Sequence, residues 1–173
     1  MPALWLKRLV ATAFVVGLMS VAVAAGTINV SHKKGVDFAA FKTYAMGAVA
    51  VTGDANPKMV QHMVSAVDRQ MSALGFRKVE TDPDLIVNTQ HWRGLSYPTW
   101  WSKQFSELDL NYRKLVVAQV VVELTDARSQ EVVFSGTARR SVSLKDKTNE
   151  RHADESVAEL FDESPWGTDF DDD

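Results

Sequence analysis

The sequence predicts an α+β fold: a two-layer sandwich in which a mainly antiparallel sheet of about six strands has two helices packed on one face. Two patterns indicate this class. Residues 115–142 form two runs of alternating apolar and polar side chains around a short polar turn, which is typical of a half-buried hairpin. Residues 56–75 and 148–165 instead repeat apolar side chains at helical spacing.

The hairpin Leu115–Val142 is expected at the centre of the sheet, and its turn, Asp126–Gln130, is rich in turn-forming residues. Gly136 suits close packing or a bulge. Arg140 falls on the apolar face, which indicates either a strand end or an acidic partner. The residues predicted on that face are Val116, Ala118, Val120, Val122 and Leu124 in the first strand, and Val132, Phe134, Gly136, Ala138 and Val142 in the second.

The first helix has recognisable signals at both ends. Asn56 is a good N-cap, Pro57 suits the first helical position, and Gly75 stands where a C-terminal glycine is expected. One stripe of apolar side chains lies between these signals and should face the sheet. It consists of Val60, Met63, Val64, Val67, Met71 and Leu74.

The other elements follow from shorter patterns. Alternation predicts strands over residues 27–32, 42–46, 76–80 and 85–92, and residues 47–55 are expected to form a loop of small residues. The connector at 37–41 has two aromatic side chains that should enter the core. A second helix is expected to begin at Thr148 or Asn149 and to end at Ser164-Pro165. Its apolar face would consist of Ala153, Val157, Leu160 and Phe161.

Both ends of the chain differ from the domain expected over residues 25–165. Lys7 and Arg8 precede an apolar run that ends in Ala22-Val23-Ala24, which is typical of a cleaved signal peptide over residues 1–24. A retained membrane anchor is the competing interpretation, and the small residues at its end favour cleavage. Cleavage would leave no integral membrane span. Residues 166–173 are acidic and are expected to form a disordered tail.

The charge and the cysteine count exclude several classes of function. The formal net charge is −3, and cleavage would remove two basic residues and no acid. The mature chain should therefore not be attracted to nucleic acid or to anionic lipid by charge alone. The sequence has no cysteine, which excludes disulfides, thiol catalysis and cysteine metal sites.

The aromatic-rich stretch at residues 92–112 is the strongest candidate for a binding site. Its central part, residues 94–111, joins two predicted strands and shows no clear period, and long connections of this kind are often functional. Exposed rings could contact a protein partner or stack on a glycan. The alternative is a loop that packs over the sheet. The candidate residues are Trp92, Tyr97, Trp100, Trp101, Phe105 and Tyr112.

No catalytic residue, metal site or cofactor is predicted from the remaining polar residues. The four histidines are scattered, and none forms a pair with the spacing of metal ligands. Ser135-Gly136 lacks the glycine-flanked pattern of a hydrolase serine. Asp82 and Asp84 flank Pro83, so they are better explained as turn residues than as paired catalytic carboxylates.

Four motifs in a fixed order resemble domain of unknown function family 4136, a group of bacterial envelope proteins that are often lipoproteins. They are DFAAFKTYAM at 37–46, ALGF at 73–76, DPDLIV at 82–87 and LTDARSQEVVFSGTA at 124–138. The similarity covers Ile28 to Pro165. The sequence departs from the family in lacking a lipobox cysteine, and it has Phe134 where relatives often carry tryptophan. The resemblance implies an envelope location and a small α+β fold, and it supplies no catalytic residue.

These observations predict an exported, periplasmic, non-enzymatic module that binds or scaffolds another component of the cell envelope through residues 92–112. The expected partner is an envelope protein or a glycan, and the protein could also lie at the periphery of a membrane. One alternative is a glycan- or lipid-binding protein that uses the same residues. A second alternative is an enzyme whose site is not recognisable from the sequence.

Overall fold

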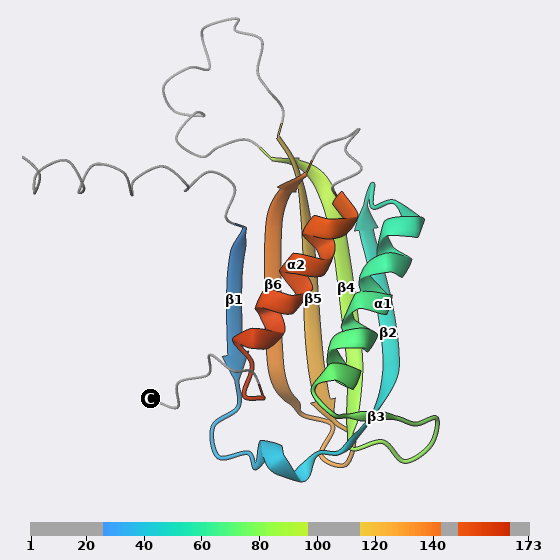
Figure 1. The fold of residues 1–173 in the computed structure, drawn as a ribbon, viewed down its shortest axis with the longest axis vertical. Coiled ribbons are helices and arrows are strands. Elements are labelled where there is room, and N and C mark those ends of the chain that lie inside the picture. Colours follow the sequence, from blue (N-terminus) through green and yellow to red (C-terminus); the bar gives the residue numbers. More distant parts are fainter. Residues whose placement is uncertain (1–25, 97–114, 143–148, 167–173) are drawn as a thin grey trace, which may run out of the picture.

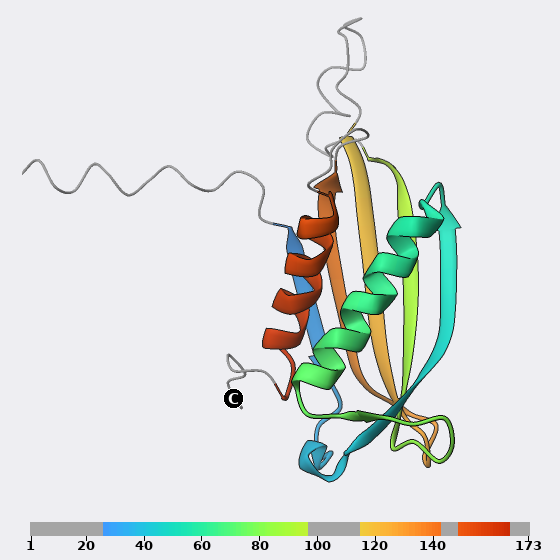
Figure 2. The ribbon, with the colours of Figure 1, turned by 45° about the vertical axis from the view of Figure 1, so that its right-hand side comes forward.

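A computed structural model describes residues 26–96, 115–142 and 149–166, and it confirms the predicted α+β sandwich. One sheet forms the first layer, and both helices lie side by side on the same face of it (Figures 1 and 2). A short 3₁₀ turn, η1, precedes the second strand. The elements are β1 (Thr27–His32), η1 (Phe38–Ala40), β2 (Thr43–Gly53), α1 (Pro57–Ala73), β3 (Arg77–Lys78), β4 (Leu85–Ser96), β5 (Leu115–Asp126), β6 (Val132–Val142) and α2 (Asn149–Asp162).

The sheet has the strand order β1-β6-β5-β4-β2-β3 and is mixed. The pairs β1–β6, β6–β5 and β5–β4 are antiparallel, as predicted for the central hairpin and its neighbours. β2 is instead parallel to both β3 and β4, and α1 lies in the connection that parallel strands require. Both helices consequently cover the face formed by the central strands, where the apolar residues of β4, β5 and β6 point.

The hairpin register explains which of its residues enter the core. Leu124 pairs with Phe134, but Thr125 pairs with Val132, so the strand has one extra residue at Val133. This bulge reverses the side to which the first residue of β6 points. Val133 is 2% exposed and Val132 is 46% exposed, so the prediction that Val132 shares the buried face is wrong.

Close packing between the layers confirms the role expected for Gly136. A Cβ atom at this position would lie 2.6 Å from Cδ2 of Leu160, whose side chain is fully buried. The predicted face of α2 is also confirmed, because Ala153, Val157, Leu160 and Phe161 are all buried. Arg140 forms ion pairs with Glu155 and Glu159 of this helix, which confirms the interpretation that an acidic partner explains its place on the apolar face.

The first helix begins and ends as its sequence predicts. The Asn56 side chain accepts a hydrogen bond from the backbone N–H of Lys58 at 2.9 Å, and Pro57 is the first helical residue. Gly75 follows the helix with φ +88°, a conformation that glycine adopts at little cost.

The second strand is longer than predicted, because residues 47–53 continue it instead of forming a loop, and residues 49–53 pair with β4. The pairing shifts register between Met46 and Val49, and the side chain of Asn88 accepts a hydrogen bond from the Ala48 N–H across this shift at 2.8 Å. Small and β-branched residues then continue β2 beside the C-terminal half of β4. β4 is also longer than predicted, because it ends at Ser96 and not at Trp92. β3 is shorter than predicted and consists of two residues.

Trp166, which the sequence assigned to the tail, packs into the molecule. Its indole Nε1–H donates a hydrogen bond to the carbonyl oxygen of Phe38 at 3.0 Å. Its ring centroid lies 4.9 Å from that of Phe38 and 5.3 Å from that of Phe76, with edge-to-face geometry. The ordered packing thus extends one residue past Pro165. The predicted signal peptide and the rest of the tail lie outside the described residues. Within the described part, no helix is long and apolar enough to cross a membrane.

Candidate functional site

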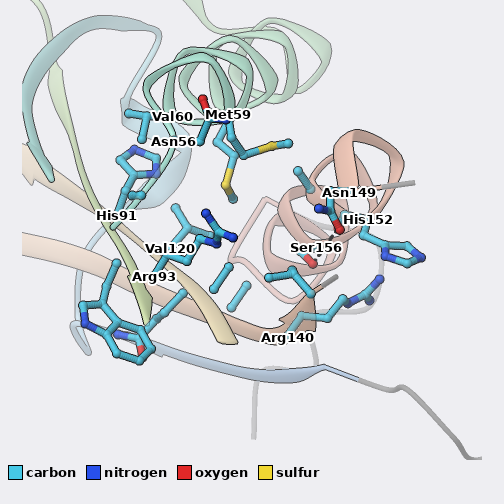
Figure 3. A pocket seen from close by; sticks show the side chains of 18 residues that line it. Asn56, Met59, Val60, His91, Arg93, Val120, Arg140, Asn149, His152 and Ser156 are labelled. Atoms are coloured by element: carbon cyan, nitrogen blue, oxygen red, sulfur yellow. Dashed lines mark hydrogen bonds between the residues drawn. The ribbon is translucent and has the colours of Figure 1, made fainter. Parts of the chain in front are cut away.

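A pocket of about 140 Å³ lies between the sheet and the N-terminal halves of the two helices (Figure 3). The central strands form its floor, and the first turns of α1 and α2 form its walls. The starts of both helices lie opposite His91, Trp92 and Arg93 in the second half of β4. At this end of the molecule, side chains do not fill all of the space between the helices and the sheet, and the remaining space is the pocket.

Most of the pocket wall is apolar. Met59, Val60 and Met63 enter it from α1, and they belong to the side of this helix that turns toward the sheet. Val120 and Ala138, which are paired across β5 and β6, contribute the floor. Methionine side chains are flexible and adapt to varied apolar shapes. This lining suits the hydrocarbon part of a ligand or of a partner side chain.

His91 and Ser156 are the buried polar residues that line the pocket, and His91 is the one whose ring nitrogens face it from the sheet. His91 follows Leu85, Val87 and Thr89 on the side of β4 that faces the helices, and it is 3% exposed. Its Nε2 lies 3.0 Å from the hydroxyl oxygen of Thr89, whereas Nδ1 has no hydrogen-bond partner among the described residues. Burial lowers the pKa of His91, because the charged ring would lose its hydration. The ring is therefore neutral at neutral pH and has one nitrogen available to a ligand.

Arg93 is the charged residue nearest to His91 along β4. Its Nη1 donates a long hydrogen bond of 3.4 Å to the carbonyl oxygen of Asp54, and no described carboxylate forms an ion pair with it. In Figure 3 the side chain extends into the space below Met59. The charge of Arg93 is thus not neutralised by a described acid.

The second arginine of the pocket is in a different situation. Arg140 donates to Glu155 at 3.1 Å and to Glu159 at 3.3 Å, and its side chain is 13% exposed. These ion pairs join β6 to α2. Arg140 therefore fixes the position of the helix, and Arg93 remains the cation that a ligand could neutralise.

Of the predicted binding residues, only Trp92 lies in the described part of the chain. Trp92 is one of the residues that line the pocket, but it alternates with His91 and Arg93 along β4, so its indole lies on the opposite face of the sheet, against Gly94. A Cβ atom on Gly94 would lie 2.7 Å from Cζ2 of Trp92. The other predicted residues, Tyr97, Trp100, Trp101, Phe105 and Tyr112, lie outside the described residues.

Sequence analysis missed His91 and Arg93 as site residues, although the sequence contained a signal for His91. In the strand predicted at 85–92, His91 occupies the same alternating face as Leu85 and Val87. A histidine that continues an apolar face is either satisfied in the core or available to a ligand. Only the position of the two helices distinguishes these cases.

The other polar candidates have structural roles. The carboxylate of Asp84 accepts hydrogen bonds from the N–H groups of Lys42 and Thr43 and from the Thr43 hydroxyl, at 2.9–3.0 Å. These bonds lower the pKa of Asp84, the Lys42 N–H having the largest effect. His62 and Arg69 of α1 both contact Asp154 of α2, at 3.0 and 2.7 Å, and so connect the helices. The described ranges contain no cluster of three histidine or acidic side chains that could hold a metal ion.

Comparison with known proteins gives a family and a fold. The model of the DUF4136 family, described as a domain of unknown function, matches residues 28–166. No curated protein matches the chain.

Solved structures with this fold come from several bacteria. A DUF4136 family protein from Bacteroides thetaiotaomicron is 16% identical and aligns over 82% of this chain and 96% of its own, with a TM-score of 0.57. A PelC dodecamer from Paraburkholderia phytofirmans is 16% identical and aligns over 84% of this chain and 100% of its own, with a TM-score of 0.55. At these identities the similarity establishes the fold alone, and the site must be interpreted from its own chemistry.

Proposed function

Because the chain belongs to the DUF4136 family, a domain of unknown function, we propose a role from its own residues: a non-enzymatic module of the bacterial cell envelope that binds or scaffolds another envelope component. The pocket between the helices supports this proposal most directly. Ligand sites are generally concave and mainly apolar, with a few polar groups that orient the ligand. The apolar side of α1 with His91 and Arg93 has this composition.

The polar contacts of the pocket favour binding over catalysis. The pair formed by Thr89 and His91 has the donor–acceptor arrangement of a nucleophile and a base. The Thr89 hydroxyl, however, belongs to a residue that is 1% exposed and does not line the pocket. A substrate in the pocket could not reach it without a rearrangement of β4. The interaction is better explained as one that fixes the orientation of the His91 ring.

The proposal also includes the aromatic residues at 92–112. β4 ends at Ser96 and β5 begins at Leu115, so this segment joins the sheet at the same end as the pocket. Aromatic side chains beside a pocket would add contact area for a partner. The apolar run with an A-x-A site at residues 9–24 supports export, and with it a periplasmic location.

A second candidate function is the binding of a lipid, and the pocket lining favours it over the binding of a glycan. Methionine and valine side chains offer no hydrogen bonds to sugar hydroxyl groups. They do offer burial to a hydrocarbon group, worth about 25 cal/mol for each Å² removed from water. A glycan would have to rely on other residues, such as the aromatic side chains at 92–112.

Photo-crosslinking in the intact cell tests the proposed function. A photoreactive residue would replace Met59 at the pocket, Trp101 in the aromatic segment or, as a matched control, Val132, which is exposed at the opposite end of the sheet. Adducts would be identified by mass spectrometry. We expect one dominant envelope component from Met59 or Trp101 and none from Val132. Equal adducts at all three positions, or none at Met59 and Trp101, would contradict the proposal.

A further inference from the structure

The size of the pocket limits the class of ligand. Its volume is about 140 Å³, and an apolar protein cavity of ~150 Å³ accommodates benzene. The enclosed part of a ligand is therefore about as large as one six-membered ring or a short acyl chain. A longer molecule would have to extend beyond the described walls.

The charges around the pocket favour a negatively charged group on that ligand. Arg93 forms no ion pair with any acid in the described part of the chain, whereas Glu155 and Glu159 are paired with Arg140. Glu150, in the first turn of α2, is exposed and does not line the pocket. Of the two guanidinium groups that line the pocket, an anion that enters would thus meet one, on Arg93, that no described acid neutralises, and it would meet no carboxylate from the lining residues.

Both helices direct their N-termini at the same pocket. Asn56 and Met59 belong to the start of α1, and Asn149 and His152 to the start of α2. Backbone N–H groups at helix N-termini are partly unsatisfied, and the helix dipole places positive potential there. Two N-termini that converge with Arg93 create a region that stabilises negative charge.

His91 supplies an independent indication of a ligand. A buried polar atom without a partner costs free energy, so Nδ1 of His91 is expected to bond to a group that enters the pocket. When the Thr89 hydroxyl donates to Nε2, the neutral ring has its proton on Nδ1 and can donate to an oxygen of the ligand. Figure 3 shows this ring beside Val60 and Asn56, at the wall that also includes the start of α1.

From these four features we propose that the pocket binds a small amphiphilic anion, with its hydrocarbon group between Met59, Met63 and Val120 and its carboxylate or phosphate at Arg93 and His91. This inference rests on the proposed function, because it assigns the ligand chemistry of the same site. A fatty carboxylate and the phosphate end of a lipid share this chemistry.

Isothermal titration of the folded protein with four probes tests the proposal. Octanoate and octyl phosphate combine both ligand features, octan-1-ol lacks the charge, and inorganic phosphate lacks the hydrocarbon group. We expect at least one of the two charged amphiphiles to bind about tenfold or more tightly than octan-1-ol and inorganic phosphate. The stronger of the two then identifies the head group. Equal affinity for octan-1-ol, equal affinity for inorganic phosphate, or no binding of either amphiphile would overturn the proposal.

Two arginine variants locate the anion. Arg93→Gln removes the cation of the pocket, whereas Arg77→Gln removes the same charge from exposed β3 at the other end of the sheet. We expect Arg93→Gln to weaken binding of the charged amphiphile about tenfold and to leave octan-1-ol unchanged, and Arg77→Gln to affect neither. Equal losses in both variants would show a general charge effect and overturn the assignment.

The ligand assignment can fail while the proposed function stands. If the charged amphiphiles do not bind but Met59 forms an adduct with an envelope protein, the pocket receives a protein side chain and the anion proposal is wrong. If the charged amphiphiles do not bind and neither Met59 nor Trp101 forms a dominant adduct, both proposals are wrong.

Discussion

The two ends of the sandwich are built from the same strands and helices but are filled differently. At the end near η1 and β3, aromatic rings close the space between the layers. At the end where both helices begin, methionine, histidine and arginine side chains surround an open volume. The rings at the closed end are Phe38, Phe76, Phe134, Phe161 and Trp166.

If the pocket binds a ligand as proposed, this difference separates stability from binding within one small domain. Large rings in edge-to-face contact bury much apolar area and leave no room for a ligand. The pocket end lacks part of that packing, and Nδ1 of the buried, neutral His91 has no hydrogen-bond partner among the described residues. We therefore expect substitutions to be most costly at the closed end and to affect ligands at the open end.

Removal of an aromatic ring at the closed end should have the largest effect. Phe134 is 1% exposed, and its ring contacts those of Phe161 and Trp166. We expect Phe134→Ala to lower the free energy of unfolding by about 3–5 kcal/mol, because the cavity cannot collapse among rigid rings. Urea denaturation measures this change. Val132→Ala, at an exposed position two residues earlier, is the control and should cost less than about 0.5 kcal/mol. Similar losses in the two variants would contradict the closed-end packing.

A pair of methionine variants on one helix compares the ends directly. Met71 is fully buried near the closed end of α1, and Met59 is partly exposed at the pocket. We expect Met71→Ala to cost about 2–5 kcal/mol and Met59→Ala less than about 1 kcal/mol, because Met59 already borders empty space. Both are measured by denaturation without added ligand. An equal cost at the two positions would show that the pocket is as tightly packed as the core.

The carboxylate of Asp84 should stabilise the start of β2 in a pH-dependent way. Asp84→Asn is expected to cost about 1–3 kcal/mol at neutral pH, because an ionised acceptor of three hydrogen bonds is lost. Since folding lowers the pKa of Asp84, its contribution is present above the pKa of the unfolded chain and is lost as the pH falls below about 4. The variant should therefore lose less stability than the original chain between pH 5 and 2. Parallel stability curves would contradict this role.

His91 should produce a smaller effect in a different pH range. Burial lowers its pKa, so below about pH 6.5 the unfolded chain binds a proton that the folded chain does not. Stability should decrease as the pH falls from 7 toward 5, with a slope of at most about 1.4 kcal/mol per pH unit from this residue. We expect His91→Gln to reduce the slope in denaturation curves recorded across this range. An unchanged slope would mean that His91 is hydrated in the folded state.

The sequence predicted elements whose signals are local and missed features that depend on tertiary packing. The caps at Asn56 and Gly75 and the alternation of the hairpin are local, and the structure confirms them except at Val132, where a bulge reverses the alternation. The extension of β2 past Gly47 depends on pairing with β4, which no local pattern encodes. Trp166 resembled part of an acidic tail, because its partners Phe38 and Phe76 are distant in sequence.

The candidate site also depends on tertiary packing, which the sequence pattern does not reveal. Trp92 drew attention through the aromatic residues around it, but alternation along β4 directs it away from the helices. His91 and Arg93 are adjacent to it in sequence and become a site only because α1 and α2 begin above them. A pocket made by the angle between two helices and a sheet has no signature in any one segment.

An NMR titration tests the central claim, that one end binds and the other stabilises. The ¹⁵N-labelled protein would be titrated with octanoate and with octyl phosphate, and backbone amide shifts would be mapped on the fold. We expect saturable shifts at Asn56, Met59, His91 and Arg93 with at least one of these amphiphiles, and an unchanged indole N–H signal for Trp166. Shifts centred on Phe76 and Trp166, or no saturable shifts with either amphiphile, would contradict this claim.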